Sequence, residues 1–188
     1  MLSHADLFSV TTIRLRGTLT LDLGEPSHAE SINRIIQKEQ PYLREWLPWV
    51  DSAKDLKSSL DYYSNCQVQH KLREVVQFTI CDDGVPIGTI GTHIINWSHK
   101  STSIGYWISK EYAGQGIMTD AVQTFSQLLF AKSDLHRLEI RAAVENIASR
   151  KVAKKAGYQE EGILRDAEFL YDHFVDLVVH SLLRDRQK

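Results

Sequence analysis

A short glycine-containing turn constrains this chain more than any other feature of its sequence. Residues 110–121 read K-E-Y-A-G-Q-G-I-M-T-D-A, with Gly114 and Gly116 one residue apart and an apolar, helix-like run after them. Glycine adopts backbone angles that side chains forbid, and it lets a ligand approach the main chain closely. A helix that begins after such a turn presents unpaired N–H groups and the positive end of its dipole. The pattern therefore predicts an anion site of the kind that binds phosphate.

Length and composition limit which phosphate ligands are plausible. The chain has 188 residues, 43% of them hydrophobic and 24% charged, which suits one globular domain over residues 1–188. The net charge of −2 and pI near 6.4 offer no basic surface for nucleic acid. No apolar run approaches the ~18 residues of a membrane span, and the opening M-L-S-H-A-D-L-F lacks the regions of a signal peptide. We expect a cytoplasmic protein that binds neither nucleic acid nor membrane.

Hydrophobic periodicity predicts the order of helices and strands. Helices are expected after Pro26, at residues 53–70, at residues 116–132, and between Asn146 and the stop signal Gly157. Strands are expected at residues 11–23 (a strand or hairpin), 74–81, 86–95, 101–109, 137–144, 158–164 and 169–183. The turn signal Asp82-Asp83-Gly84 joins two of them, 74–81 and 86–95, as a hairpin. This mixed order predicts an α/β (α+β) fold with a mixed sheet rather than a uniformly parallel one.

Two common phosphate-binding motifs do not fit the glycine turn. A dinucleotide fingerprint needs a third glycine where this chain has Thr119, and it needs a βαβ unit around it. A P-loop needs Gly-Lys-Ser/Thr after four spacer residues, which is absent. A G-x-G turn is a weak signal by itself, and a turn shaped only by chain geometry is the alternative.

A second motif makes the glycine turn more informative. Residues 142–158 read A-A-V-E-N-I-A-S-R-K-V-A-K-K-A-G-Y, and residues 105–121 read G-Y-W-I-S-K-E-Y-A-G-Q-G-I-M-T-D-A. In this order they resemble the GNAT superfamily of acetyl-CoA-dependent N-acetyltransferases, and especially its ribosomal-protein N-terminal (alanine/serine) acetyltransferase branch. The resemblance runs from the first strand through W-L-P-W-V at 46–50 to the last strand. It implies a single-domain, mostly antiparallel mixed sheet flanked by helices. One departure is Glu111, where the superfamily often has Gln or Arg.

The resemblance implies acetyl-CoA as cosubstrate and assigns residues to it. The pyrophosphate would meet the backbone amides of the glycine turn, and the pantetheine arm would pair with strand residues 107–109. A splay between the strands at 101–109 and 137–144 would admit that arm. The residues assigned to acetyl-CoA in this way are Trp107, Ile108, Ser109, Ala113, Gly114, Gln115, Gly116, Ile117, Met118, Asn146, Ser149 and Lys151.

Asn146, the basic residues of the last predicted helix and two tryptophans each have both a functional and an ordinary structural interpretation. Asn146 either hydrogen-bonds a pantetheine amide or simply caps the next helix, or does both. Arg150, Lys151, Lys154 and Lys155 either meet the nucleotide phosphates or form a solvated basic helix end that complements the dipole. Trp46 and Trp49 either wall the acceptor site or pack in the core around Pro48.

The resemblance also proposes catalytic residues. Many GNAT enzymes have an acidic tyrosine four residues before the closing glycine, but this chain has Ala153 there. The N-I-A-S sequence of this chain instead resembles the N-x-x-S pattern of the ribosomal branch, which makes Ser149 the candidate proton donor to the departing thiolate. The alternative is that Ser149 is an ordinary helix-surface serine. In the same branch, the stretch that resembles D-A-E-F-L at 166–170 supplies a glutamate, so Glu168 is the candidate base. The alternative is that Glu168 is an ordinary solvated carboxylate at the end of a strand. A backbone N–H near Ile108 would meet the oxyanion.

The predicted reaction is acetyl transfer from acetyl-CoA to an amine, most specifically the α-amine of a ribosomal protein. The alternatives are a small amine such as an aminoglycoside or polyamine, and a non-catalytic acyl-CoA-binding module. The eight histidines form no ligand pair, so no metal is expected. Cys66 and Cys81 are interpreted as packed thiols. A homodimer is compatible with the resemblance.

Overall fold

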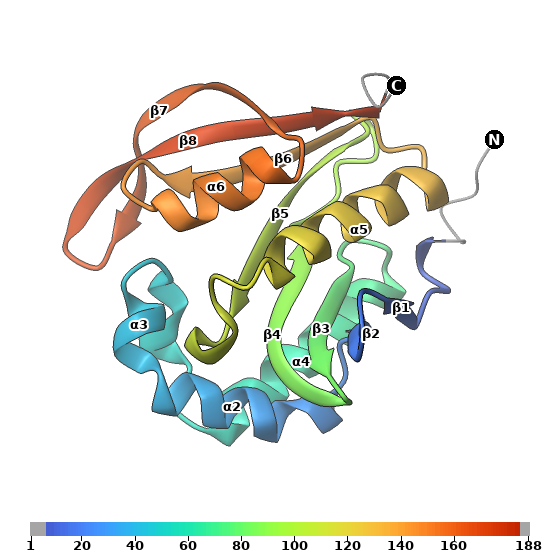
Figure 1. The fold of residues 1–188 in the computed structure, drawn as a ribbon, viewed down its shortest axis with the longest axis vertical. Coiled ribbons are helices and arrows are strands. Elements are labelled where there is room, and N and C mark those ends of the chain that lie inside the picture. Colours follow the sequence, from blue (N-terminus) through green and yellow to red (C-terminus); the bar gives the residue numbers. More distant parts are fainter. Residues whose placement is uncertain (1–6, 185–188) are drawn as a thin grey trace.

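A computed structural model describes residues 7–184; the opening residues 1–6 considered above lie outside this range. The chain folds around one mixed eight-stranded sheet with the order β1-β2-β3-β4-β5-β6-β8-β7 (Figure 1). The strands are β1 Thr12–Arg14, β2 Leu19–Leu23, β3 Gln77–Asp82, β4 Val85–Thr92, β5 Ser101–Ile108, β6 Arg137–Ala143, β7 Gln159–Leu170 and β8 His173–Leu183. Every pairing is antiparallel except that of β5 with β6. The expected mostly antiparallel, mixed α/β single-domain fold is confirmed.

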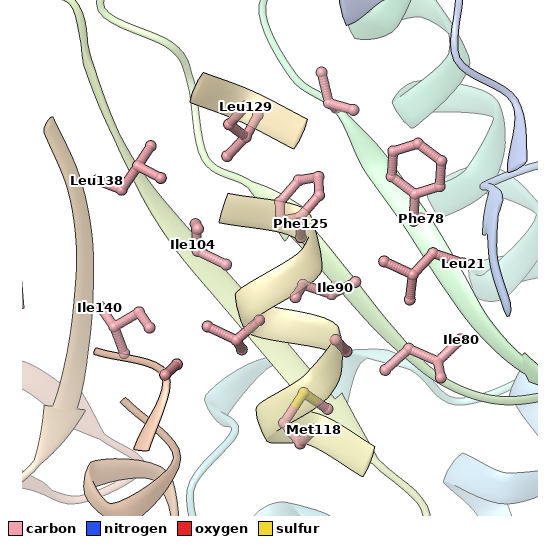
Figure 2. Close-up of a cluster of buried hydrophobic side chains, with 14 of the residues drawn as sticks. Leu21, Phe78, Ile80, Ile90, Ile104, Met118, Phe125, Leu129, Leu138 and Ile140 are labelled. Carbon is pink, nitrogen blue, oxygen red and sulfur yellow. The ribbon is translucent and has the colours of Figure 1, made fainter. Parts of the chain in front are cut away.

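Helices cover both faces of this sheet. They are η1 Pro26–His28, α2 Ala29–Lys38, α3 Gln40–Arg44, η2 Pro48–Ser52, α4 Leu56–Lys71, η3 Lys110–Tyr112, α5 Ile117–Lys132 and α6 Ile147–Lys155. Helix α5 lies across one face, where Met118, Phe125 and Leu129 meet the strand side chains of the larger core cluster (Figure 2). A smaller cluster on the other face joins α2, α3, η2 and α4 with the half-buried Trp107 of β5. None of the helices described in this structure is long and apolar enough to cross a membrane.

The middle of the sheet opens where β5 and β6 part. These two strands pair only from Ser101–Ser103 to Arg137–Glu139, and Figure 1 shows them diverging beyond that point. The rest of β5 pairs with β4, and the rest of β6 pairs with β8. The second half of β5 therefore has an edge without a partner strand on the β6 side, which is the splay that the resemblance implied.

The local turn signals in the sequence correspond to the observed turns. Asp83 and Gly84 both have positive φ, at 47° and 77°, as a two-residue hairpin between β3 and β4 requires. At the end of α6, the Tyr158 N–H donates to the Ala153 carbonyl at 3.1 Å and Gly157 has a φ of 94°. This is the glycine-terminated helix end expected at Gly157.

Some expected element boundaries were wrong. The last two strands are divided at Tyr171–Asp172, whereas residues 165–168 had been left between them. Those residues instead form an irregularity within β7, where the register shifts between Leu164 and Glu168, and Asp166 has a φ of 48°. A bulge resembles a turn in sequence because both use polar residues and unusual backbone angles. The short helices α3 and η2 were also not expected, and α4 begins at Leu56 rather than at residue 53.

Candidate active site

The glycine turn has the backbone geometry of an anion site. Gly114 and Gly116 have φ of 78° and 82°, in the left-handed region that favours glycine. Helix α5 begins at Ile117, and the Asp120 N–H donates to the Gly116 carbonyl at 3.1 Å. The N–H groups of residues 117–119 therefore precede the first helical hydrogen bond and are directed along the helix axis into the turn. The N–H of Ala113, in contrast, already donates to the Lys110 carbonyl at 3.2 Å.

An arginine that the sequence pattern did not single out lies beside this turn. Arg16, between β1 and β2, donates to the Gln115 carbonyl and forms an ion pair with Asp120 at 3.1 Å. Its guanidinium lies 3.6 Å from the position that a Cβ on Gly116 would occupy. Glu111 points its charge elsewhere, because it pairs with Lys38 at 2.6 Å. The cation near the glycine turn thus comes from the first hairpin, almost a hundred residues away.

The free edge of β5 presents Ile108 more directly than its neighbours. Backbone N–H and C=O groups alternate between the two edges of a strand. The Ser109 N–H donates to the Ile87 carbonyl in β4 at 2.8 Å, so Ser109 and Trp107 direct their backbone groups toward β4. Ile108 and Tyr106 direct theirs toward the splay. Of the predicted residues 107–109, Ile108 is therefore the one whose N–H is available to a ligand there.

The end of β5 is held by a buried carboxylate from the segment between α2 and α3. Glu39, between α2 and α3, is only 8% exposed and accepts hydrogen bonds from Ser109 Oγ at 2.8 Å and the Lys110 N–H at 2.7 Å. Charge-assisted hydrogen bonds of this kind are stronger than neutral ones. Ser109 is thus occupied by a structural contact that links the helices of the smaller cluster to the start of the glycine turn.

The first turn of α6 brings together a serine and a tyrosine. Asn146 is the N-cap, because its Oδ1 accepts from the Ser149 N–H at 3.0 Å. The hydroxyl oxygen of Tyr106 lies 3.0 Å from that of Ser149 and 3.2 Å from the Ser149 carbonyl oxygen, within hydrogen-bond reach of both. Burial raises the pKa of Tyr106 to about 12. Tyr106 was not among the predicted site residues, since no local pattern connects it to a helix 43 residues further on.

The basic residues of α6 have different surroundings. Arg150 donates to the Val144 carbonyl at 2.8 Å and lies 3.6 Å from the Glu160 carboxylate, so it ties α6 to the sheet. Lys151, Lys154 and Lys155 are exposed. The predicted phosphate contact is therefore better suited to these lysines than to Arg150.

The candidate base lies on the hairpin of β7 and β8. Glu168 is half-buried and sits opposite Val175. Burial raises the pKa of its carboxyl group, the direction that makes a carboxylate a stronger base. The turn of this hairpin is docked to the α3–η2 segment, since Tyr171 Oη donates to the Leu47 carbonyl at 2.7 Å and the Arg44 guanidinium stacks 3.7 Å from the Tyr171 ring centroid. Figure 1 shows the hairpin reaching toward α3.

Aromatic side chains lie on the face of β5 opposite Tyr106. The ring centroids of Trp49 and Trp107 are 6.1 Å apart, and Trp49 is 37% exposed, so Trp49 is not a core residue. Trp46 is half-buried.

A separate open pocket of about 520 Å³ lies at the docked hairpin turn, and it is lined by Arg44, Glu45, Asp51, Leu170, Tyr171, Asp172 and His173. None of these belongs to the glycine turn or α6, so this pocket is not the predicted acetyl-CoA site.

This combination defines a class of enzyme. A mixed sheet that splays at its centre, beside a glycine turn and a helix N-terminus, is the arrangement that the resemblance to acetyl-CoA-dependent enzymes predicted. The sequence profile of the family described as "Acetyltransferase (GNAT) domain" matches residues 18–159, and the chain belongs to this family. It is accordingly an N-acetyltransferase with acetyl-CoA as cosubstrate. In residues 7–184, no group of three or more His, Cys, Asp or Glu side chains could hold a metal ion.

Individual relatives are similar over nearly the whole chain. YdaF of Bacillus subtilis (strain 168), provisionally named a ribosomal N-acetyltransferase, is 32% identical over 92% of this chain and 95% of its own length. The ribosomal-protein-serine acetyltransferase of Escherichia coli (strain K12) is 29% identical over 94% of this chain and 98% of its own. A solved structure of RimL, an L7/L12 α-N-protein acetyltransferase, in complex with coenzyme A superposes with a TM-score of 0.88. Its sequence is 23% identical over 92% of this chain and 97% of its own length. At this identity, the similarity establishes the shared fold alone.

Proposed function

We propose that this enzyme acetylates the N-terminal α-amine of a ribosomal protein. The observation that carries the proposal is the similarity to the Escherichia coli ribosomal-protein-serine acetyltransferase, which extends over 98% of that enzyme. A match of this extent includes the N-terminal helices as well as the acetyl-CoA half of the domain. Acetyl-CoA and ribosomal proteins meet in the cytoplasm, so the proposal places the enzyme there. A homodimer stays a prediction.

Similarity to an enzyme with a small-molecule acceptor is much less extensive. The spermidine N(1)-acetyltransferase of Vibrio cholerae is 26% identical over 53% of this chain and 58% of its own length. A partial match is what a shared acetyl-CoA site produces when the acceptor sites differ. This contrast favours a protein acceptor over a polyamine.

The proposed binding of acetyl-CoA uses the backbone more than side chains. The pyrophosphate would meet the N–H groups at the start of α5, where a helix terminus contributes ~0.3–1 kcal/mol per favourable charge contact. The exposed lysines of α6 would contact the nucleotide phosphates. The pantetheine arm would lie along the free edge of β5, beside Tyr106 and Ile108. Asn146 has one amide N–H₂ group left for a pantetheine carbonyl while its Oδ1 caps α6.

The proposed chemistry begins with a neutral amine. An α-amino group with a pKa of ~7.8 is ~14% neutral at pH 7, whereas a lysine near 10.4 is only ~0.04% neutral. A carboxylate that orients the ammonium group and takes its proton, directly or through one water, is sufficient for the first and poor for the second. Glu168 fits this role because it is half-buried and its pKa is raised by burial.

Transfer then requires two further groups. The amine attacks the thioester carbonyl, and the Ile108 N–H would stabilise the oxyanion that forms. The nitrogen then loses its second proton to solvent, the oxyanion re-forms the carbonyl, and the C–S bond breaks with its electron pair on sulfur, to which the Ser149 hydroxyl would supply a proton. The acetylated amine and free CoA leave, and solvent restores the proton of Ser149.

Intact-mass analysis of ribosomal proteins tests the acceptor. Ribosomal proteins extracted from a strain that lacks the gene are incubated with the enzyme and acetyl-CoA, and the same reaction without acetyl-CoA is the control. We expect one protein to gain the mass of one acetyl group, located at its N-terminal residue by fragmentation. Acetylation confined to lysine side chains, or thiol release with spermidine and none with ribosomal proteins, would contradict the proposal. Absence of thiol release with every amine would favour a non-catalytic acyl-CoA-binding module.

A further inference from the structure

Tyr106 and Ser149 connect the two sides of the splay. Tyr106 lies three residues beyond Ser103, where the pairing of β5 with β6 ends, and Ser149 lies in the helix that follows β6. Their hydroxyl oxygens are 3.0 Å apart. Tyr106 packs against the larger core cluster on the α5 face, so its ring is held in place. The hydroxyl pair therefore sits at the point where the sheet opens.

The number of hydrogens in this pair limits its arrangements. Each hydroxyl has one hydrogen, and Tyr106 has two acceptors in reach, the Ser149 hydroxyl oxygen at 3.0 Å and the Ser149 carbonyl at 3.2 Å. If Tyr106 donates to the carbonyl, its own oxygen is free to accept the Ser149 hydrogen. If Tyr106 donates to the Ser149 hydroxyl oxygen, the Ser149 hydrogen must point elsewhere. A helical serine commonly returns this hydrogen to a carbonyl of the preceding turn, which would withhold it from a ligand.

We infer that Tyr106 is a positioning residue for acetyl transfer, acting through Ser149. By donating to the Ser149 hydroxyl oxygen, Tyr106 turns the hydrogen of Ser149 toward the sulfur of the departing CoA. When the C–S bond breaks and the electron pair stays on sulfur, the Ser149 proton moves to the thiolate. Solvent delivers a proton to the Ser149 oxygen as its own proton leaves, so no alkoxide accumulates beside Tyr106, which keeps its proton and its hydrogen bond to Ser149. The inference rests on the proposed function, in which Ser149 protonates the thiolate.

The surroundings of Tyr106 suit a permanent donor. Its pKa, raised by burial to about 12, keeps the phenol protonated throughout the neutral pH range. Aligned hydrogen bonds polarise one another, so a donor behind Ser149 strengthens the bond that Ser149 gives. The arrangement also compensates for Ala153, which stands where many GNAT enzymes have their acidic tyrosine. Here a tyrosine hydroxyl reaches the same helix from a strand.

A double-mutant cycle separates this role from a structural one. We expect Tyr106→Phe to lower kcat roughly 10-fold, as loss of a hydrogen bond to a developing charge does, and Ser149→Ala to lower it roughly 100-fold. Because Tyr106 acts through Ser149, the double variant should be no slower than Ser149→Ala. The Kd of acetyl-CoA, measured by calorimetry, should stay within about twofold in all three variants, a smaller change than loss of one hydrogen bond would cause.

The chain offers a matched control. Tyr158 and Ser126 form another buried hydroxyl pair, with oxygens 2.8 Å apart, within the same core. Tyr158→Phe should leave kcat unchanged and shows what loss of a buried tyrosine hydroxyl does by itself. Thermal unfolding of each variant identifies any that fails to fold, and Ser149→Thr, which keeps a hydroxyl, should restore sensitivity to Tyr106→Phe.

Two results would overturn the inference while leaving the proposed function intact. One is a wild-type kcat in Tyr106→Phe together with a slow Ser149→Ala. The other is an effect of Tyr106→Phe that persists in the Ser149→Ala background, because a residue that only ties α6 to β5 acts independently of the Ser149 hydroxyl. A wild-type rate in Ser149→Ala would instead remove Ser149 from the proposed mechanism, and the inference with it. The same cycle can be followed by the slow hydrolysis of acetyl-CoA, in which the thiolate also departs, so it does not depend on the acceptor.

Discussion

Ser109 donates a hydrogen bond to the buried carboxylate of Glu39 at 2.8 Å, across 70 residues of sequence. The same carboxylate accepts from the Lys110 N–H, so the junction of α2 and α3 holds the chain where β5 ends and the glycine turn begins. This one buried carboxylate therefore links the helices of the smaller cluster to the start of the glycine turn.

Replacing Glu39 tests how much this link stabilises the fold. Glu39→Gln removes the charge and one acceptor oxygen, so a neutral amide oxygen remains for the Lys110 N–H and the N–H₂ group faces the Ser109 hydroxyl, which must then accept. We expect the free energy of unfolding in urea to fall by about 1.5–3 kcal/mol, the usual range for hydrogen bonds to charged groups. We also expect the KM for acetyl-CoA to rise, because the glycine turn loses its support. Glu45→Gln, at an exposed position in the neighbouring turn, is the control, and equal stability of the two variants would contradict the interpretation.

Gly116→Val tests the glycine turn as the pyrophosphate site. The φ of 82° at Gly116 is strained for any side chain, and costs a β-branched residue ~1–2 kcal/mol or more. We expect calorimetric titration to detect no binding of acetyl-CoA, because a branched side chain would enter the approach of the pyrophosphate. Gly84→Val has similar strain, at a φ of 77° in the β3–β4 turn, and should bind acetyl-CoA normally. Unchanged affinity in Gly116→Val would exclude this turn from the site.

Glu168→Gln tests the proposed base. The substitution keeps the shape and one acceptor oxygen but removes the charge that orients an ammonium group. We expect a higher acceptor KM and a decrease in kcat/KM of ~10²–10⁴, the contribution of a positioned acid–base group. The loss should shrink from pH 6.5 to pH 9 as α-amines become neutral without help, while the affinity for acetyl-CoA is retained. Rates within twofold of wild type throughout would leave water as the proton acceptor.

The same variant should also differ from wild type in stability, and this difference should grow as pH rises from acid to neutral. Because burial raises the pKa of Glu168 in the folded state, the native protein holds this proton more tightly than the unfolded chain. Folding is therefore penalised as pH rises through the interval between the unfolded and folded pKa values, and the full penalty is present at neutral pH. We expect Glu168→Gln to have a higher Tm than wild type at pH 7, with the difference vanishing in acid below the unfolded pKa of ~4.3. A lower Tm at pH 7 would show that the carboxylate is stabilised by a contact instead.

Tyr171→Phe tests whether docking of the hairpin turn positions Glu168. The variant loses the hydrogen bond to the Leu47 carbonyl but keeps the ring beneath Arg44. Loss of one such bond, worth ~1 kcal/mol, should raise the acceptor KM about fivefold and leave the KM for acetyl-CoA unchanged. Phe169→Leu, at an exposed position of the same hairpin, is the control. Equal changes in both KM values would indicate a general loosening of the fold rather than an effect on the acceptor side.

The sequence determined those features that depend on neighbouring residues. Paired glycines followed by an apolar periodic run were enough to predict the turn and the start of α5, because backbone angles and helix termini are local properties. Asn146 three residues before Ser149, and Gly157 at the end of α6, identified that helix for the same reason. The resemblance carried by these two motifs led to the enzyme family. Local signals were insufficient at residues 165–168, where a bulge in β7 has the composition of a turn.

Contacts between distant residues depend on how the sheet and helices pack. The contacts of Glu39 with Ser109, of Arg16 with Gln115, and of Tyr106 with Ser149 each join elements that are far apart in the sequence. No local pattern records such pairs, since they arise from the order of strands in the sheet and from the point where β5 and β6 separate. The sequence thus predicted an anion site and the chemistry proposed for it. The packing of the sheet and helices determined which carboxylate supports it, which cation approaches it, and which hydroxyl stands behind the candidate acid.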